Sequence, residues 1–284
     1  MISFTTAQLS AWIAGFLWPL TRILGLITAA PVFGNTGVPT LIKLTLGVTL
    51  ALVVAPVIPP VPSVDPTSWP GLLIAAQEML IGVAMGFSLR LVFAAIEFAG
   101  EVASSVMGFS FATFFDPTSA GRSNAVSQFL TLVATMAFLA LNAHLALIQA
   151  LVESFFTLPI STTPMSLSAP LEMARWGSRI FSAGLQIAMP IVAALLITNI
   201  ALAILTRAAP QLNLFGIGFP ITLGVGFLVI SFTLPYLGQP MANLFNEGIE
   251  AGRKIPRTAA ARPAPAPAPA PALIPAPAPS AATR

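Results

Sequence analysis

The sequence contains no cysteine and a single histidine, His144. Without cysteine there is no disulfide framework, no thiolate metal site and no thiol nucleophile. One histidine also argues against zinc or di-iron centres, which need several such ligands. We therefore expect no bound metal and no cofactor.

Charged residues are scarce: they make up 7% of the 284 residues, whereas hydrophobic residues make up 56%. A soluble globular domain carries about 25% charged residues, so most of the polar surface that water requires is missing. The net charge of +3 is small. It reflects a shortage of acids rather than a basic patch, so nucleic-acid binding has no support. The composition indicates an integral membrane protein in contact with lipid.

Recognisable catalytic motifs are missing too. The sequence has no Gly-x-x-x-x-Gly-Lys-Ser/Thr phosphate loop, no Gly-x-Ser-x-Gly elbow and no His-Glu-x-x-His pair. An enzyme would have to work with one histidine and nine acidic residues. We therefore expect a protein that is not an enzyme.

Six long apolar stretches fill most of the chain. A helix of about 20 apolar residues crosses a bilayer, and the stretches lack the short alternating pattern of β-barrel strands. The predicted fold is an all-α integral membrane protein with about six long, proline-interrupted hydrophobic helices. The stretches are about Leu9–Ala30, Leu41–Ile58, Leu72–Phe98, Val126–Phe156, Ile180–Ala208 and Leu212–Leu237.

The chain changes character at Pro256, beyond which alternating proline and alanine predominate. This composition favours an extended polyproline conformation over a packed core. We predict a hydrophobic helical domain over residues 1–255 and a Pro/Ala-rich disordered tail over residues 256–284. If all six stretches span, both termini share one side, and its excess of Lys and Arg predicts the cytoplasm.

Two hypotheses account for the charges inside the apolar stretches, where each is costly against lipid. In the first, Glu78, Arg90 and Glu97 line an ion or proton path. In the second, the charges are paired in helix contacts, within the chain or with other subunits. We favour the second because no repeated acidic ladder is present. Gly82 and Gly86 form a Gly-x-x-x-Gly step, which lets another backbone approach closely.

His144 also allows two interpretations. It forms a proton relay with Asn142 and Gln149 or, as we favour, it is a helix-end residue satisfied by a neighbour. The predicted buried polar and packing residues are Arg22, Glu78, Arg90, Glu97, Asn142, His144, Arg207, Gln211 and Asn213.

Four phenylalanines and a methionine fall within residues 107–115, inside a predicted structured loop over Gly100–Asn124. The run is too short to span a membrane and too apolar to face water. Bulky, deformable side chains suit a constriction that blocks water and ions yet yields to a passing chain. The alternative is an interfacial loop anchored by its aromatic residues.

These motifs, in this order, resemble the flagellar biosynthetic protein FliR family, the R subunit of the flagellar type III secretion export gate. The resemblance extends over about residues 10–245. The strongest run is Thr-Arg-Ala-Ala-Pro-Gln-Leu-Asn-Leu-Phe-Gly-Ile-Gly-Phe-Pro. The runs that carry the resemblance are residues 30–34, 78–87, 99–101, 107–117, 138–144, 154–159 and, the strongest, 206–220.

The resemblance implies part of the entrance channel through which unfolded flagellar proteins leave the cytoplasm during flagellum assembly. The implied location is the bacterial inner membrane, at the flagellar basal body. The implied partners are the P and Q subunits in a hetero-oligomer, the B subunit, the unfolded export substrates and membrane lipid. Other subunits would then cover helices broken by proline or bearing charge.

The family's plug loop corresponds to residues 108–122, which favours the gate over the interfacial loop. The residues that the resemblance places in or beside this plug are Met107, Gly108, Phe109, Phe111, Phe114, Phe115, Asp116 and Pro117. Residues 218–224 resemble the flagellar branch more than the virulence branch. The alternatives are an injectisome export-gate subunit, a self-contained permease for small solutes or ions, and an intramembrane enzyme. The Pro/Ala tail and Ala143 depart from the family pattern.

Overall fold

The computed structural model describes residues 6–109, 124–163, 168–209 and 214–260, and every regular element within them is a helix. The predicted all-α class is therefore confirmed. The elements are α1 (Thr6–Ala29), α2 (Thr40–Val54), α3 (Trp69–Met107), α5 (Ala125–Ala140), α6 (Ala143–Thr157), α7 (Ser168–Gly177), α8 (Arg179–Ala208), α9 (Leu214–Thr233), the 3₁₀ turn η3 (Leu234–Tyr236) and α10 (Gly238–Ala259).

The number of full membrane spans is lower than the six stretches suggest. Four of the described helices are long and apolar enough to cross a membrane, and α5 with α6 makes a fifth candidate. Helix α2 is apolar but has 15 residues. At 1.5 Å per residue it is shorter than the hydrocarbon core of about 30 Å. The protein is a multi-pass membrane protein with four or five candidate spans.

The stretch predicted over Val126–Phe156 is two helices, α5 and α6, with a bend of 66° between them. Asn142 lies at the break with a φ of 55°, and it is the one non-glycine residue with positive φ in the described part of the chain. Asparagine tolerates the left-handed region better than most other residues. The conformation of Asn142 therefore redirects the chain inside what reads as one apolar segment.

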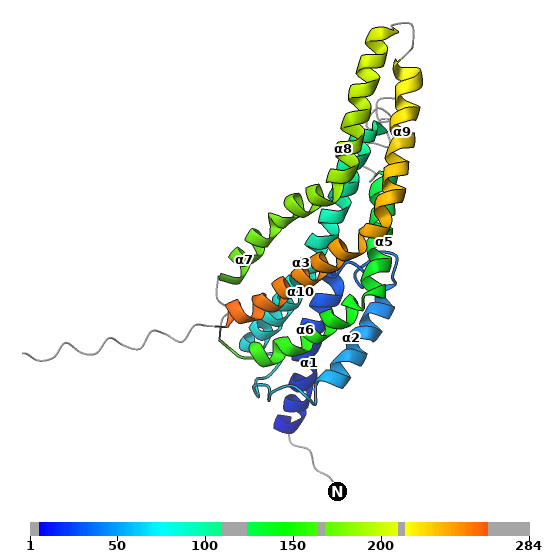
Figure 1. The fold of residues 1–284 in the computed structure, drawn as a ribbon. Coiled ribbons are helices and arrows are strands. Elements are labelled where there is room, and N and C mark those ends of the chain that lie inside the picture. Colours follow the sequence, from blue (N-terminus) through cyan, green and yellow to red (C-terminus); the bar gives the residue numbers. More distant parts are fainter. Residues whose placement is uncertain (1–5, 110–123, 164–167, 210–213, 261–284) are drawn as a thin grey trace, which may run out of the picture.

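Helix α3 is the central helix, because α1, α5, α8, α9 and α10 all pack against it. It runs between the end of the elongated molecule formed by α1, α2 and α6 and the projecting α8–α9 pair (Figure 1). At its start, Ser68 Oγ accepts a hydrogen bond from the Gly71 N–H at 3.2 Å, and Pro70 occupies the first turn, as favoured at helix starts. It ends at Met107, and the following Gly108 has a left-handed φ of 94°.

Glycines let α1 and α3 cross at close range. A Cβ atom at Gly82 would overlap the carbonyl oxygen of Arg22, and one at Gly86 would lie 2.7 Å from the carbonyl oxygen of Leu26. The prediction that the Gly-x-x-x-Gly step admits another backbone is confirmed, and that backbone is α1.

Two predicted boundaries differ from the structure. Residues 100–107, expected in a loop, are the last two turns of α3. Helix α10, which the apolar pattern did not predict, continues through Pro256 to Ala259, past the predicted boundary at residue 255. Its apolar side includes the buried Met241, Phe245 and Ile255. Because this side packs on α3, α5, α6 and α7, burial outweighs the cost of a proline in the last turn.

Candidate functional site at the base of the aromatic loop

The described residues include only the start of the predicted gate. Met107 is fully buried at the end of α3, Gly108 follows in the left-handed conformation, and Phe109 is half-buried. The predicted gate residues that lie outside the described residues are Phe111, Phe114, Phe115, Asp116 and Pro117. The structure therefore shows the base from which this segment leaves α3 and to which it returns.

Helix α9 holds the end of α3 in place. The Oγ1 atom of Thr222 donates a hydrogen bond to the carbonyl oxygen of Met107 at 3.1 Å, and Thr222 is itself buried. A Cβ atom at Gly226 would lie 2.6 Å from the terminal methyl carbon of Met107, so this glycine makes room for the methionine. Ile191 and Leu195 of α8 belong to the same buried cluster. Met107 therefore couples α3 to the α8–α9 pair.

Helix α5 returns to the same part of α3. Asn124, immediately before α5, donates from Nδ2 to Glu101 Oε2 at 2.7 Å, and its backbone N–H reaches Glu101 Oε1 at 3.4 Å. One turn further on, Ser127 Oγ donates to the carbonyl oxygen of Glu97 at 2.6 Å. A Cβ atom at Gly100 would overlap the backbone of Ser127. Both ends of residues 110–123 are therefore fixed to the last turns of α3.

A second polar site lies at the other end of α3. Arg22 Nε donates to Glu78 Oε2 at 2.6 Å, and both side chains are almost wholly inaccessible to solvent. Arg22 also donates from Nη1 to Ser154 Oγ at 3.1 Å and from Nη2 to the Leu158 carbonyl oxygen at 3.0 Å. Its guanidinium carbon lies 4.3 Å from the centre of the Phe155 ring. One guanidinium thus links α1, α3 and the end of α6.

The remaining predicted polar residues do not join this cluster. Arg90, Glu97, Asn142 and Arg207 are exposed on the surface of the single chain, so Glu78 shares no buried path with Arg90 and Glu97 among the described residues. The predicted packing residues outside the described residues are Gln211 and Asn213.

The three residues of the alternative relay do not form a hydrogen-bonded chain. His144 is half-buried, and its ring centre lies 6.3 Å from that of Phe138. Its Nδ1 has no partner among the described residues. Gln149 instead donates to Glu153 Oε1 at 2.8 Å. The described geometry gives His144 an aromatic neighbour rather than a proton donor or acceptor.

Sequence reasoning did not predict the roles of Glu101, Asn124 and Thr222 at the loop base. Asparagine is typical of the residue before a helix, so Asn124 was recognisable as a helix start. An acid in the last two turns of the preceding helix was a plausible partner for it. Nothing in the sequence around Thr222 indicates that its hydroxyl reaches Met107, because the contact joins residues 115 positions apart.

The fold and the two sites define a class: an α-helical, multi-pass membrane protein in which one central helix carries a buried ion pair and anchors the residues on both sides of segment 110–123. The family described as "Bacterial export proteins, family 1" matches residues 13–248, and the chain belongs to this family.

The particular relatives are flagellar biosynthetic proteins FliR, so the predicted family is confirmed. The FliR protein of Pectobacterium carotovorum subsp. carotovorum is 43% identical over 251 residues, which cover 87% of this chain and 94% of that protein. That of Escherichia coli (strain K12) is 40% identical over 247 residues, with the same two shares. That of Bacillus subtilis (strain 168) is 28% identical over 243 residues, or 84% and 93%.

Proposed function

We propose that this chain is a non-enzymatic subunit of the flagellar type III export gate in the bacterial inner membrane. It forms part of the entrance channel for unfolded flagellar proteins, together with the P, Q and B subunits. The proposal rests on one observation. The FliR proteins of Pectobacterium carotovorum and Escherichia coli are similar to this chain over 94% of their own length. A similarity of that extent includes the helices on both sides of the aromatic loop.

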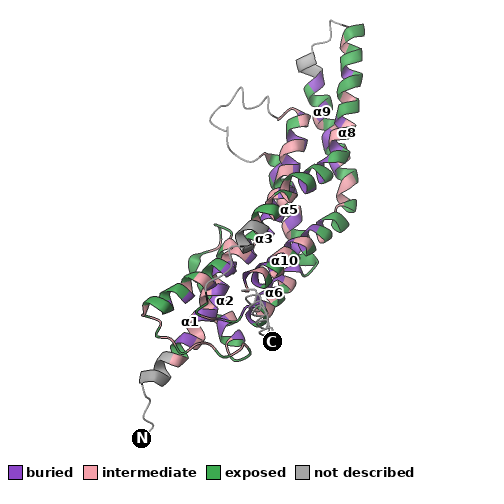
Figure 2. Ribbon diagram, turned by 90° about the vertical axis from the view of Figure 1, so that its left-hand side faces the viewer, coloured by how far each residue is buried: buried purple, intermediate pink, exposed green. Residues whose placement is uncertain are grey.

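The exposed surface of α8 and α9 supports a place in an assembly. Only 22% of the apolar window of each helix is buried within the chain, and Figure 2 shows exposed residues along both helices. Ile197, Ile204 and Phe232 are each more than 65% exposed. A helix that is apolar on nearly all sides must be covered by lipid or by other helices. The projecting α8–α9 pair offers such a surface to the P and Q subunits.

The gate itself belongs to the same proposal. Residues 108–122 close the channel at rest, with Phe111 and Phe114 among the aromatic side chains that exclude water and ions. The support is the geometry of the base, where α5, α8 and α9 fix both ends of the segment against α3. A plug needs such a rigid frame, because a loop with a mobile base would not hold a seal.

The experiment replaces both Phe111 and Phe114 with Ala in cells that make the whole export complex. We expect leakage of small ions and slower growth. Phe156→Ala, which removes an exposed aromatic side chain on α6, should cause no leak. Unchanged ion conductance in the double variant would reject the plug and leave the export function standing.

The export function has its own test. A strain without this gene should neither swim nor secrete flagellar subunits, and the intact chain should restore both and co-purify with the P and Q subunits. Uptake of a small solute by the isolated chain would instead support the permease. Loss of a chemical activity in His144→Ala would support the enzyme. Rescue of secretion only in an injectisome would support the virulence branch.

A further inference from the structure

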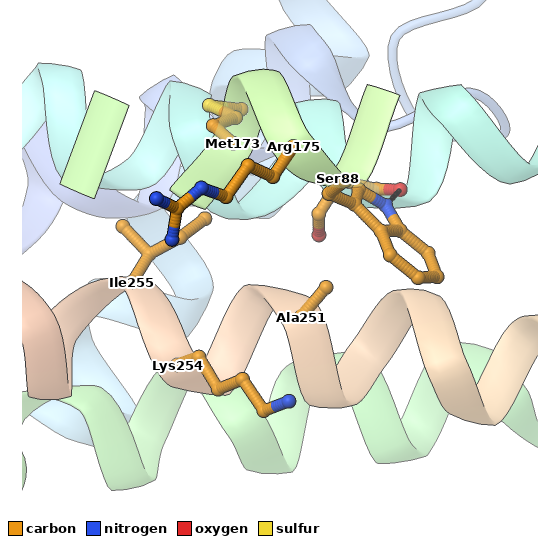
Figure 3. A pocket seen from close by; sticks show the side chains of 7 residues that line it. Ser88, Met173, Arg175, Ala251, Lys254 and Ile255 are labelled. Atoms are coloured by element: carbon orange, nitrogen blue, oxygen red, sulfur yellow. Dashed lines mark hydrogen bonds between the residues drawn. The ribbon is translucent and has the colours of Figure 1, made fainter. Parts of the chain in front are cut away.

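A hollow of about 230 Å³ lies between α7 and α10, away from the loop base. Figure 3 shows Arg175 extending from α7 toward α10, Lys254 on that facing helix, and Ser88 of α3 to the right of Arg175. Pockets for drug-sized ligands are about 300–1,000 Å³, so this one suits a smaller chemical group. The residues of α7 and α10 that line it are Met173, Arg175, Trp176, Ala251, Lys254 and Ile255.

The charge around this hollow favours an anion. Residues 168–179 and 238–259 contain five basic and three acidic residues. Two of the acids are already engaged: Glu247 pairs with Arg179 at 2.7 Å, and Glu250 pairs with Arg253 at 2.7 Å. Lys254 is exposed and has no acidic partner among the described residues. The side chain of the third acid, Glu172, lies outside the described residues. Among the described side chains, Lys254 therefore brings a positive charge without an ion-pair partner to the hollow.

The lining of the hollow also has the residue types of a membrane–water interface. The candidate span that continues into α8 begins at Met173, so Met173, Arg175 and Trp176 occupy its first turn. Tryptophan and basic residues are typical of the membrane–water interface. The Trp176 side chain is fixed there, because its Nε1 donates to the Ser88 carbonyl oxygen at 3.1 Å. The site thus combines an apolar wall, an oriented indole and basic side chains.

We propose that this hollow, the α7–α10 hollow, binds a phosphate-bearing anionic group, supplied in the membrane by the headgroup of an acidic phospholipid. Arg175 and Lys254 contact the phosphate, while Met173, Trp176 and Ile255 contact the first carbons of the attached lipid. A zwitterionic headgroup carries its own cation and gains less from the two basic residues. The site is independent of the aromatic loop and of the export function.

The test measures lipid binding by the chain purified within its export complex and stripped of lipid. Phosphatidylglycerol and phosphatidylcholine are added separately, and native mass spectrometry counts the lipids that stay bound. We expect the wild type to prefer phosphatidylglycerol. The double variant Arg175→Ala/Lys254→Ala should bind it about 25-fold more weakly, at about fivefold for each basic residue near a membrane surface.

Two controls separate this site from general electrostatic attraction. Arg175→Lys/Lys254→Arg keeps both charges and should keep most of the affinity. Arg90→Ala/Arg207→Ala removes two exposed charges elsewhere and should leave this affinity unchanged. The proposal is overturned if Arg175→Ala/Lys254→Ala binds phosphatidylglycerol as the wild type does, or if the Arg90/Arg207 variant loses as much.

Competition with inorganic phosphate distinguishes a soluble phosphate from a phospholipid headgroup as the ligand. If millimolar phosphate displaces phosphatidylglycerol, and the loss of phosphate binding follows the Arg175/Lys254 variant, the site takes a soluble phosphate. If phosphate does not compete, the site needs the whole headgroup with its acyl chains. Neither measurement requires export activity, so failure here would not bear on the export proposal.

Discussion

Arg22 of α1 and Glu78 of α3 form an ion pair, 2.6 Å between Nε and Oε2, that neither water nor lipid reaches. The pair lies at the crossing where Gly82 lets the two helices approach. A charge in such a place is tolerated only when it is paired and hydrogen-bonded. Arg22 meets that condition with three acceptors from two other helical segments. The pair therefore specifies which faces of α1 and α3 meet.

We predict that replacing one member of this pair lowers the free energy of unfolding by more than replacing both members together. Arg22→Met or Glu78→Leu leaves a buried charge without its partner, at a cost of about 3–5 kcal/mol. The double variant leaves no charge, so its loss should be clearly smaller than the sum of the two. The measurement is the midpoint of thermal unfolding of the purified chain in detergent. Arg90→Met, an exposed cation on the same helix, is the control, and strict additivity would contradict the coupling.

The close crossing of α1 and α3 gives a second prediction. Gly82→Ala forces a methyl group into the backbone of Arg22, and overpacking of this kind costs about 1–3 kcal/mol. Gly224 lies within α9, and a methyl group added to it would meet no atom within 4 Å apart from its chain neighbours and the adjoining backbone of α9. Gly224→Ala should therefore be neutral or raise stability by up to about 1 kcal/mol. Equal unfolding midpoints for the two variants would show that the helices can move apart without cost.

Much of the fold could be predicted from the sequence, because apolar length and composition are properties of single segments. The pairing of Arg22 with Glu78 could not, because nothing local tells a residue in one helix which residue of another it will face. Arg90 and Glu97 show that spacing along a helix also does not tell whether a shared face is buried. Their spacing puts them on one face of a helix, yet that face is exposed in this chain. Helix α10 was not predicted, because its charged residues prevent its sequence from reading as a membrane span.

The anchor of the loop base leads to a third prediction, which depends on the proposed gate. Glu101→Ala removes the acceptor for the Asn124 side chain. A hydrogen bond to a charged group contributes about 1.5 kcal/mol, and the variant loses that contribution. Export complexes with this variant should leak ions, though less than those lacking Phe111 and Phe114. Ion conductance and growth are the readouts.

Glu97→Ala is the matched control for that experiment. Glu97 lies one turn earlier on α3, with its side chain exposed, and its backbone carbonyl accepts a hydrogen bond from Ser127 of α5. Its replacement should therefore leave the loop base intact. A leak of equal size from both variants would mean that negative charge, rather than the Asn124 contact, keeps the channel closed.

The end of the chain gives the fourth prediction, because α10 ends at Ala259 and the alternating Pro/Ala sequence follows it. A chain that stops after Ala260 keeps all of α10 and should export and swim as the full chain does. A chain that stops after Arg253 loses the buried Ile255, Pro256 and Ala259. The loss of one buried isoleucine alone typically costs about 2–5 kcal/mol, so the shorter chain should be less abundant in membranes and less motile. Immunoblots of membrane fractions and swimming in soft agar measure both effects. A non-motile strain with the longer chain would assign a role to residues 261–284, and normal motility with both would show that α10 is stable without its last turn.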